Sequence, residues 1–169
     1  YNKDEKKIVG GKNGYGAKVT NIFSKWFTVE TVDHIQKKLY TQTFRENMTV
    51  IEPPKITKCS KKPYTKVTWL TDFERFGIQQ FSPDMVSLMV RRVYDIAGVT
   101  DKQMSVFYNG EKLKIKSFQD YLSLYPTESK KHYEKVSDRW EVAVCPSSND
   151  KFEQVSFVNG IATPKGGIH

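Results

Sequence analysis

Residues 10–18, Gly-Gly-Lys-Asn-Gly-Tyr-Gly-Ala-Lys, have the composition of a loop that holds an anion. Four glycines fall within seven positions, and glycine lets the backbone adopt positive φ and approach a ligand closely. The apolar residues Val19 and Ile22 follow and predict a helix whose first N–H groups and positive dipole end face the loop. Lys12 and Lys18 flank this point, where a cation costs about 0.3–1 kcal/mol unless an anionic ligand neutralises it. The residue types therefore suit phosphate binding, although a glycine-rich turn before a helix is more often an ordinary loop.

The loop fits neither of the common phosphate-binding fingerprints. Gly11 and Gly16 have the separation of a Walker A loop, but Ala17 stands where that loop requires lysine. The dinucleotide pattern also fails, because Val19 stands where a third glycine is required and no strand is predicted before the loop. On these residues alone, an ordinary glycine-rich turn is the alternative to a phosphate site.

The whole chain has the length and composition of a folded protein that works near anions. Its 169 residues allow one domain or the joined parts of two, and 38% hydrophobic residues suffice for a packed core. No stretch approaches the roughly 20 apolar residues of a membrane span. The net charge of +8 suits nucleic acid or phosphate partners. Because the chain begins at Tyr1 rather than Met, we expect a segment of a longer protein.

The cysteines, histidines and lysines are less specific. Cys59 and Cys145 lie far apart without metal-ligand spacing, which predicts reduced thiols in a cytosolic or nuclear protein, and the three histidines are scattered, so no metal site is expected. The lysines form two clusters, which are expected to be a solvated rim, with nucleic-acid contact as the alternative. The clusters are Lys55, Lys58, Lys61, Lys62 and Lys66, and then Lys112, Lys114 and Lys116.

A helix and an antiparallel sheet are expected to position the glycine loop. The helix is predicted over residues 15–24. Residues 26–32 and 38–44 are rich in β-formers or alternate apolar with polar residues, which predicts an antiparallel pair joined near Asp33. Residues 64–70 alternate in the same way and predict another half-buried strand.

The clearest helix signal begins at Ser82. This serine is a good N-cap, Pro83 suits the first helical position, and Gly98 is expected to end the helix. Arg91 and Arg92 lie in its middle and are expected to be solvated or paired with acids, with phosphate contact as the alternative.

Two further local signals follow. Asn109-Gly110 is the strongest short hairpin signal in the chain. Ser117 and Asp120 have the spacing of a capping pair for a short helix over residues 118–124.

The last part of the chain differs in composition, because a polar stretch is followed by two segments rich in β-formers. The polar stretch 126–136 predicts a loop and a domain boundary. Residues 139–144 and 152–158 then predict two strands that form a hairpin about residues 147–150.

Three blocks, residues 10–18, 91–98 and 154–163, resemble in order and spacing the ATPase region of eukaryotic-type (type IIA) DNA topoisomerase II. The likeness extends over nearly the whole chain. It implies an α+β fold, the C-terminal part of a Bergerat-type (GHKL) ATPase α/β sandwich followed by the start of an S5-like transducer domain. On this resemblance, residues 1–130 belong to the ATPase domain and residues 131–169 begin the transducer domain.

The resemblance also implies that the glycine loop is part of the lid over the triphosphate of ATP. Backbone N–H groups and Lys18 are expected to meet phosphate oxygens, and the Asn13 and Tyr15 side chains can add hydrogen bonds. Lys12 stands where the family more often has arginine, and Gly160 where serine is usual. The implied ATP-binding residues are Gly11, Lys12, Asn13, Gly14, Tyr15, Gly16, Ala17 and Lys18.

The activity implied by the resemblance is ATP-driven passage of one DNA duplex through a transient double-strand break in another. ATP with Mg²⁺ closes the lid and dimerises two such domains in a nuclear enzyme, or in the replication compartment if the protein is viral; no membrane partner is implied. The general-base Glu and magnesium-ligating Asn are expected before Tyr1, and the γ-phosphate lysine and DNA-cleaving tyrosine beyond His169. No catalytic or metal residue is therefore assigned within this chain, which alone is not expected to hydrolyse ATP.

Two other functions stay open at this point. One is another GHKL ATPase, of the mismatch-repair or chaperone type. The other is a non-catalytic basic module that binds nucleic acid through its lysine clusters.

Overall fold

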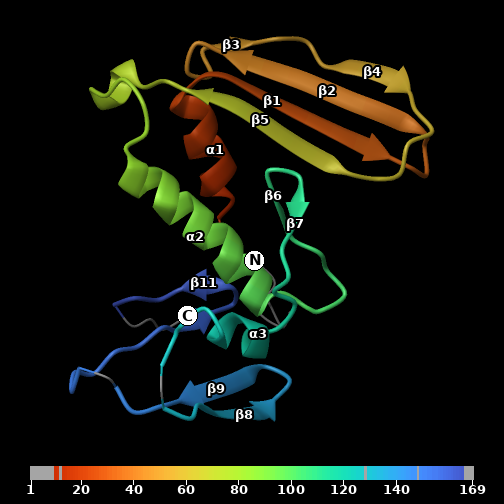
Figure 1. The fold of residues 1–169 in the computed structure, drawn as a ribbon. Coiled ribbons are helices and arrows are strands. Elements are labelled where there is room, and N and C mark those ends of the chain that lie inside the picture. The colour runs from red at the N-terminus through yellow and green to blue at the C-terminus, as the bar shows by residue number, and fades with distance from the viewer. Residues whose placement is uncertain (1–9, 12, 128, 148, 166–169) are drawn as a thin grey trace. The chain divides into compact units, whose positions relative to one another are not determined.

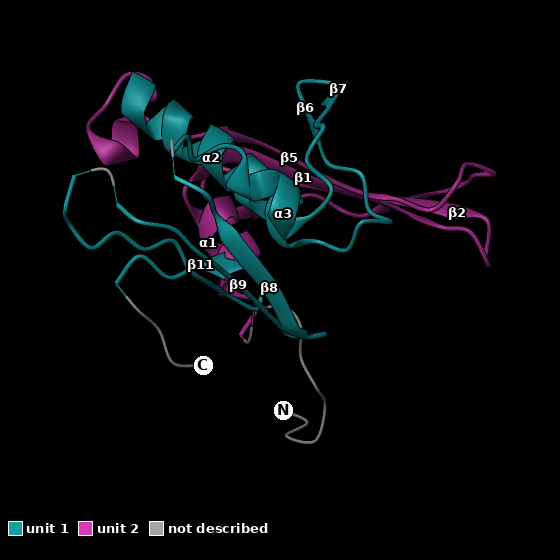
Figure 2. Cartoon of the chain, turned by 60° about the horizontal axis from the view of Figure 1, so that its bottom comes forward, with its two compact units in different colours: residues 1–10, 82–169 teal, residues 11–81 magenta. Residues whose placement is uncertain are grey.

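The computed structural model describes residues 10–11, 13–127, 129–147 and 149–165. The chain divides into two compact units (Figure 2). We call residues 11–81 the sheet unit, and residue 10 together with residues 82–165 the helix–hairpin unit. The boundary expected between residues 130 and 131 falls inside the helix–hairpin unit and stays a prediction. Among the described residues, no helix combines the length and apolar character that a membrane span needs.

The sheet unit consists of one helix, a five-stranded antiparallel sheet and a short 3₁₀ helix (Figure 1). The strand order is β3-β2-β1-β5, and β4 also pairs with β2. In chain order the elements are α1 (Tyr15–Ile22), β1 (Ser24–Asp33), β2 (Lys38–Arg45), β3 (Val50–Ile51), β4 (Lys55–Lys58), β5 (Thr65–Thr71) and η1 (Glu74–Phe76).

The core of the sheet unit lies on the central strand β1. Phe27 is buried and stands between Phe44 of β2 and Trp69 of β5 in the strand register. Helix α1 contacts β1 and β5. The predicted helix, the antiparallel pair and the third strand are confirmed. The short strands β3 and β4 were not predicted, because they flank two prolines and carry little apolar alternation.

The described residues of the helix–hairpin unit form two α-helices and three separate two-stranded hairpins. Helix α2 contacts α3 and β6. In chain order the elements are α2 (Pro83–Val99), β6 (Phe107–Tyr108), β7 (Glu111–Lys112), α3 (Phe118–Leu122), β8 (His132–Ser137), β9 (Trp140–Val144), β10 (Phe157–Val158) and β11 (Ile161–Ala162).

Helix α2 begins as predicted but does not end at Gly98. The Ser82 hydroxyl accepts a hydrogen bond from Met85 N at 3.2 Å, which confirms the N-cap. The helix continues through Val99, so the expected end at Gly98 is wrong. Gly98 is buried because the ring of Tyr121 occupies the space of a side chain, and a Cβ there would lie 2.6 Å from Tyr121 Cγ.

The two other local signals of this unit are confirmed. Asn109 and Gly110 have φ of 49° and 83° and join β6 to β7 in a tight hairpin. Asp120 N donates to Ser117 Oγ at 3.0 Å at the start of α3, which ends at Leu122. The Asp120 carboxylate accepts from Lys116 N at 2.9 Å, one residue before the N-cap, and so also holds the chain entering the helix.

The strand pairing expected after residue 126 is wrong. Residues 132–135, expected in a loop, belong to β8, which pairs with β9. The predicted strand over residues 152–158 forms only at its end, as β10, and pairs with β11 rather than with residues 139–144. The reason is a second Asn-Gly turn: Asn159 and Gly160 have φ of 49° and 77° and reverse the chain between β10 and β11.

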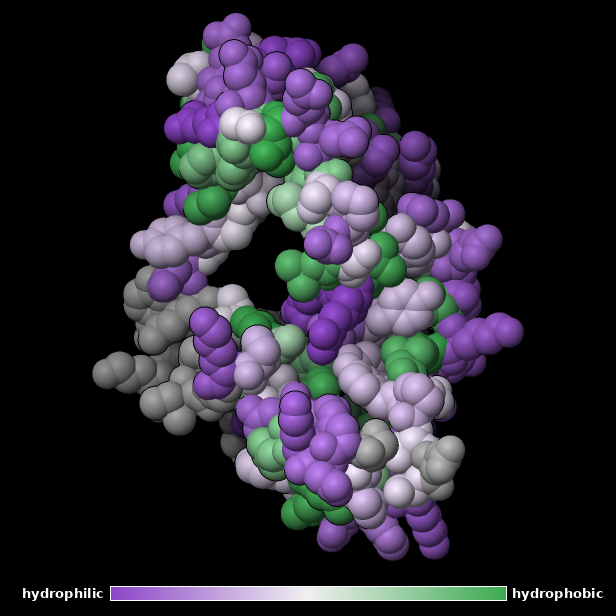
Figure 3. Space-filling view, turned by 60° about the vertical axis from the view of Figure 1, so that its left-hand side comes forward, coloured by the Kyte–Doolittle hydropathy of each residue, from purple (hydrophilic) through white to green (hydrophobic). Residues whose placement is uncertain are grey.

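Large apolar side chains are exposed in both units, and Figure 3 shows hydrophobic areas scattered among hydrophilic ones on the face that it presents. In α2 the exposed side chains include Met85, Leu88 and Met89. The buried part of this helix is its last turns, around Asp95, Ala97 and Gly98.

Candidate nucleotide-binding loop

The glycine loop forms the N-terminal cap of α1. Gly14 is the N-cap residue and has φ of 67° and ψ of 17°, a left-handed conformation that a residue with a Cβ adopts only with strain. Gly14 has no side chain with which to cap the helix, and the first turn of α1 contains no acidic residue. The first four N–H groups of an α-helix have no intrahelical partner, and the positive dipole end of α1 is not offset by an acidic residue in its own first turn.

The loop is also open. A Cβ built at Gly11, Gly14 or Gly16 would meet no atom within 4 Å. These glycines therefore do not serve close packing within the described part of the chain. Their backbone is left accessible to a ligand, as the expected phosphate contacts require. Gly10 differs, because a Cβ there would lie 1.9 Å from Ile161 Cδ1 in the helix–hairpin unit.

The predicted side chains gather at this helix start. Asn13, Tyr15 and Lys18 are exposed, and Tyr15 keeps 65% of its surface accessible. Ala17 lies between them in the first turn of α1, and Lys12 lies outside the described residues. A cation, an amide and a phenol beside the first N–H groups of a helix fit an anionic ligand such as a triphosphate.

The opposite end of α1 is fixed to the sheet unit. Ser24 is 1% exposed, and its hydroxyl donates to Thr20 O at 2.5 Å. Phe23 O accepts from Asp72 N at 3.0 Å. Arg75 stacks over the Phe23 ring at 4.8 Å and donates to Ile22 O at 3.4 Å, a favourable position for a cation at a helix C-terminus. The loop is thus presented from a helix held at its far end.

Other candidate sites do not coincide with the loop. A shallow pocket of the sheet unit contains none of the predicted residues and is lined by Lys25, Leu70, Thr71, Phe73, Glu74, Gly77, Ile78 and Gln79. Within the described ranges, no group of three or more His, Cys, Asp or Glu residues is placed to hold a metal ion.

Known proteins match this chain along its whole length. It is 51% identical over 174 residues to "Probable DNA topoisomerase 2" of Dictyostelium discoideum and 46% identical over 176 residues to "DNA topoisomerase 2 top-2" of Caenorhabditis elegans. The crystal structure of the ATPase region of Saccharomyces cerevisiae topoisomerase II superposes with a TM-score of 0.90 at 46% identity. That match covers 97% of this chain and 44% of the yeast chain.

The chain belongs to the ATPase region of the eukaryotic DNA topoisomerase II family. It spans 11% of each of these two topoisomerase II relatives. The ATPase and transducer domains of topoisomerase II from Balamuthia mandrillaris also superpose, with a TM-score of 0.87 at 42% identity, over 96% of this chain and 42% of that chain. No protein-family model matches the chain. The mixed α+β fold class is confirmed by these topoisomerase II structures.

The second and third blocks of the topoisomerase II resemblance contact each other. Arg92 Nη2 donates to Gly160 O at 2.7 Å, which ties α2 to the β10–β11 turn. Arg92 is therefore not simply solvated or paired with an acid, as expected. Its Nη1 is buried without a hydrogen-bond partner in the described part of the chain.

A buried polar pair lies beside this contact. The Tyr121 hydroxyl donates to Asp95 Oδ1 at 2.6 Å, and both residues are 3% exposed. Burial, followed by the hydrogen bond to Asp95, raises the pKa of Tyr121 well above its usual range. Sequence reasoning missed this pair, although Asp95 and Tyr121 both lie inside helices whose starts were predicted correctly.

Proposed function

We propose that this chain is the ATP-lid segment of a type IIA DNA topoisomerase, within a Bergerat-type (GHKL) ATPase domain that continues from residue 131 into the transducer. One observation carries the proposal. A chain that matches a solved topoisomerase II ATPase region over 97% of its length presents a helix that begins at a left-handed glycine, within an open glycine turn. Identities of 43–51% to topoisomerase 2 relatives favour this enzyme over a mismatch-repair or chaperone ATPase.

The loop residues bind and cover the triphosphate. The N–H groups of Gly14, Tyr15, Gly16 and Ala17 point along the dipole of α1 and donate to phosphate oxygens. Lys18, one turn into the helix, supplies a positive charge, and a charge-assisted hydrogen bond to phosphate is about twice as strong as a neutral one. Bound ATP supplies the free energy of its terminal phosphoanhydride.

The remaining side chains of the loop add directional contacts. Asn13 and Tyr15 provide an amide and a hydroxyl at the rim, and Gly11 leaves room for the ligand. Lys12, outside the described residues, completes the proposed set. Mg²⁺ accompanies the nucleotide, and no residue of this chain is proposed as its ligand or as the catalytic base.

In the whole enzyme, nucleotide binding therefore closes a gate, and hydrolysis opens it again. Closing the lid favours dimerisation of two such chains in the nucleus, and the dimer traps a DNA duplex for passage through a break. Hydrolysis then resets the gate.

The test is Lys18→Ala in the intact protein. Loss of one charge-assisted phosphate contact costs about 1.5–3 kcal/mol, so nucleotide affinity should fall about 10-fold to 100-fold and ATP-dependent strand passage should be abolished. DNA binding without nucleotide should be largely unchanged. Nucleotide binding is measured by calorimetry, and strand passage by relaxation of supercoiled plasmid.

Lys112→Ala is the matched control, because Lys112 is an exposed lysine of β7 in the other unit. It should bind nucleotide and relax plasmid like the unchanged protein. Plasmid relaxation at the normal rate by the Lys18→Ala protein would contradict the proposal.

A further inference from the structure

Six lysines meet at one end of the sheet in the sheet unit. They come from the β1–β2 turn, the first residue of β2, the last residue of β4, the β4–β5 loop and β5, and these segments lie at the end toward which the β1 and β4 arrows point in Figure 1. All six are exposed. We call this set the lysine end: Lys37, Lys38, Lys58, Lys61, Lys62 and Lys66.

The backbone beneath the lysine end is held by hydrogen bonds between distant segments. Cys59 N donates to Lys37 O at 2.8 Å, which joins the β4–β5 loop to the β1–β2 turn. Val32 N donates to Tyr64 O at 3.0 Å on the other side of β1. The lysines therefore start from fixed positions, while their long side chains extend into solvent.

The lysine end is net positive, with six lysines against two nearby carboxylates, Glu30 and Asp33. None of its lysines forms an ion pair with a carboxylate of the described residues. Lys38 and Lys58 are directly opposite each other in the β2–β4 register, an arrangement of like charges that destabilises a sheet.

The two carboxylates nearest in the register, Asp33 opposite Lys38 and Glu30 opposite Lys66, offset two of the six charges but form no ion pair with these lysines in the described part of the chain. Asp33 Oδ1 accepts from the backbone N–H groups of Ile35 and Gln36 at 2.9 and 3.0 Å and so shapes the turn. Glu30, which is opposite Lys66, accepts the Tyr64 hydroxyl, and this hydrogen bond raises the pKa of Tyr64. Further carboxylates of this unit, Glu46, Asp72 and Glu74, lie toward the opposite end of β1. A net positive surface of this kind is suited to a polyanion.

We propose that the lysine end binds the phosphate backbone of duplex DNA. The choice of DNA rests on the proposed function. Lys38 and Lys58 share one face of the sheet because they are opposite each other in the register, whereas Lys66, opposite Glu30, lies on the other face. The lysines therefore surround the end of the sheet, which is four strands or about 14 Å wide at the usual strand spacing. Duplex DNA carries one charge per roughly 1.7 Å of axis, so several phosphates lie within the reach of this surface. Lysines act on phosphate as point charges, so the contact is independent of base sequence.

Lysine footprinting of the intact protein tests the proposal. The protein is acetylated with and without a blunt 30-base-pair duplex at low salt and without ATP, and each lysine is followed by mass spectrometry. Acetylation of the lysine end should slow several-fold with DNA, whereas the control lysines of the other unit should react at the same rate. The controls are the similarly exposed Lys112, Lys114 and Lys116.

A pair of triple variants sharpens the test. Lys58→Gln, Lys61→Gln and Lys62→Gln together should reduce the slope of log affinity against log salt by about 2–3, because each lost phosphate contact removes about 0.9. The matched control carries Lys112→Gln, Lys114→Gln and Lys116→Gln and loses the same net charge. Its salt slope should stay unchanged.

Three results would overturn the proposal. They are equal acetylation with and without duplex, protection by a poly-glutamate peptide but not by duplex, and equal loss of salt slope in the two triple variants. The second result points to an acidic protein partner instead. The footprinting contains no ATP, so DNA can protect the lysine end from acetylation even if the proposed function fails because Lys18→Ala leaves strand passage intact. If DNA does not protect these lysines from acetylation while strand passage still depends on ATP, the DNA contact at the lysine end is refuted and the proposed ATP-lid function is not.

Discussion

The sheet unit and the helix–hairpin unit are held together in different ways. In the sheet unit, β1 pairs along most of its length with β2 on one side and β5 on the other, so backbone hydrogen bonds join residues far apart in sequence. In the helix–hairpin unit, β6–β7 and β10–β11 are hairpins of two-residue strands. There the distant elements are joined by side chains, through the Tyr121–Asp95 and Arg92–Gly160 hydrogen bonds.

This difference decides where single side chains matter. A backbone ladder spreads its stabilisation over many residues, and no one side chain is required for it. A contact between two helices made through one buried hydroxyl and one carboxylate depends on both groups, because either alone is left unsatisfied in the interior. The sheet unit can therefore carry unpaired charges at one end, whereas the helix–hairpin unit should be sensitive to single substitutions.

Tyr121→Ala should have the largest effect on stability. It removes a ring that packs against Gly98, Phe118 and Phe157, and it leaves Asp95 buried without its donor. Aromatic-to-alanine substitutions in a core cost about 3–5 kcal/mol. Urea unfolding of the intact protein measures the loss, and hydrogen–deuterium exchange should place it in residues 82–165.

Tyr121→Phe separates packing from hydrogen bonding in the same ring. It keeps the aromatic contacts but removes the hydroxyl, which should cost about 1–3 kcal/mol. If Tyr121→Ala instead increases exchange equally in β1 and β2, the two units are not independent in stability and the comparison is wrong.

The sequence predictions that depend on neighbouring residues were correct, whereas pairing between distant segments was predicted less well. Ser82, Asn109-Gly110 and Ser117 with Asp120 act through bonds to residues at most a few positions away, and all three signals were confirmed. Strand partners depend on segments far apart in the chain, and the pairing after residue 126 was predicted wrongly although Asn159-Gly160 carried the same turn signal.

The features around the candidate site also divide into local ones, which the sequence predicted, and contacts between distant residues, which it did not. The glycine turn at the start of α1 is local, so residue types and order were enough to predict it. The Arg92–Gly160 and Tyr121–Asp95 contacts join residues 68 and 26 positions apart, and no local pattern marks such a pair. The lysine end was only partly visible, because Lys37 and Lys38 join the predicted cluster through the β2–β4 register.

Gly98→Ala should have an intermediate effect. Its Cβ would lie 2.6 and 2.7 Å from Cγ and Cβ of Tyr121, atoms too close to the backbone to move away easily. Overpacking of this kind costs about 1–3 kcal/mol, reduced by about 1 kcal/mol because alanine favours a helix more than glycine does. The free energy of urea unfolding is compared with that of Gly16→Ala, the corresponding change in α1.

Gly16 is a suitable control because a Cβ there would meet nothing within 4 Å. Gly16→Ala should leave the free energy of unfolding unchanged or raise it by up to about 1 kcal/mol. Equal destabilisation by the two substitutions would mean that the close contact with Tyr121 does not constrain α2.

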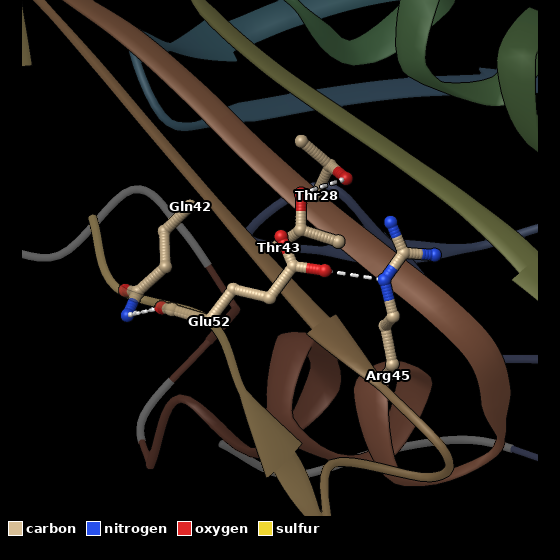
Figure 4. Close-up of polar contacts among 5 residues, drawn as sticks. All are labelled: Thr28, Gln42, Thr43, Arg45 and Glu52. Carbon is tan, nitrogen blue, oxygen red and sulfur yellow. Dashed lines mark hydrogen bonds and ion pairs between the residues drawn. The ribbon is translucent and has the colours of Figure 1, made fainter. Parts of the chain in front are cut away.

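Thr43→Val should have the smallest effect, although Thr43 lies in the middle of the sheet. Figure 4 shows the hydrogen bond that it removes, between the hydroxyls of Thr28 on β1 and Thr43 on β2, which are 3.0 Å apart. The backbone ladder on both sides of this pair is unaffected, and cross-strand pairs contribute only about 0.2–1 kcal/mol. Urea unfolding of Thr43→Val, Thr28→Val and the double variant gives the coupling energy of the pair. The double variant should be no less stable than either single one, because two apolar side chains leave no unsatisfied hydroxyl. A coupling energy as large as the cost of Tyr121→Ala would show that the sheet, too, depends on single side-chain contacts, and would remove the distinction between the two units.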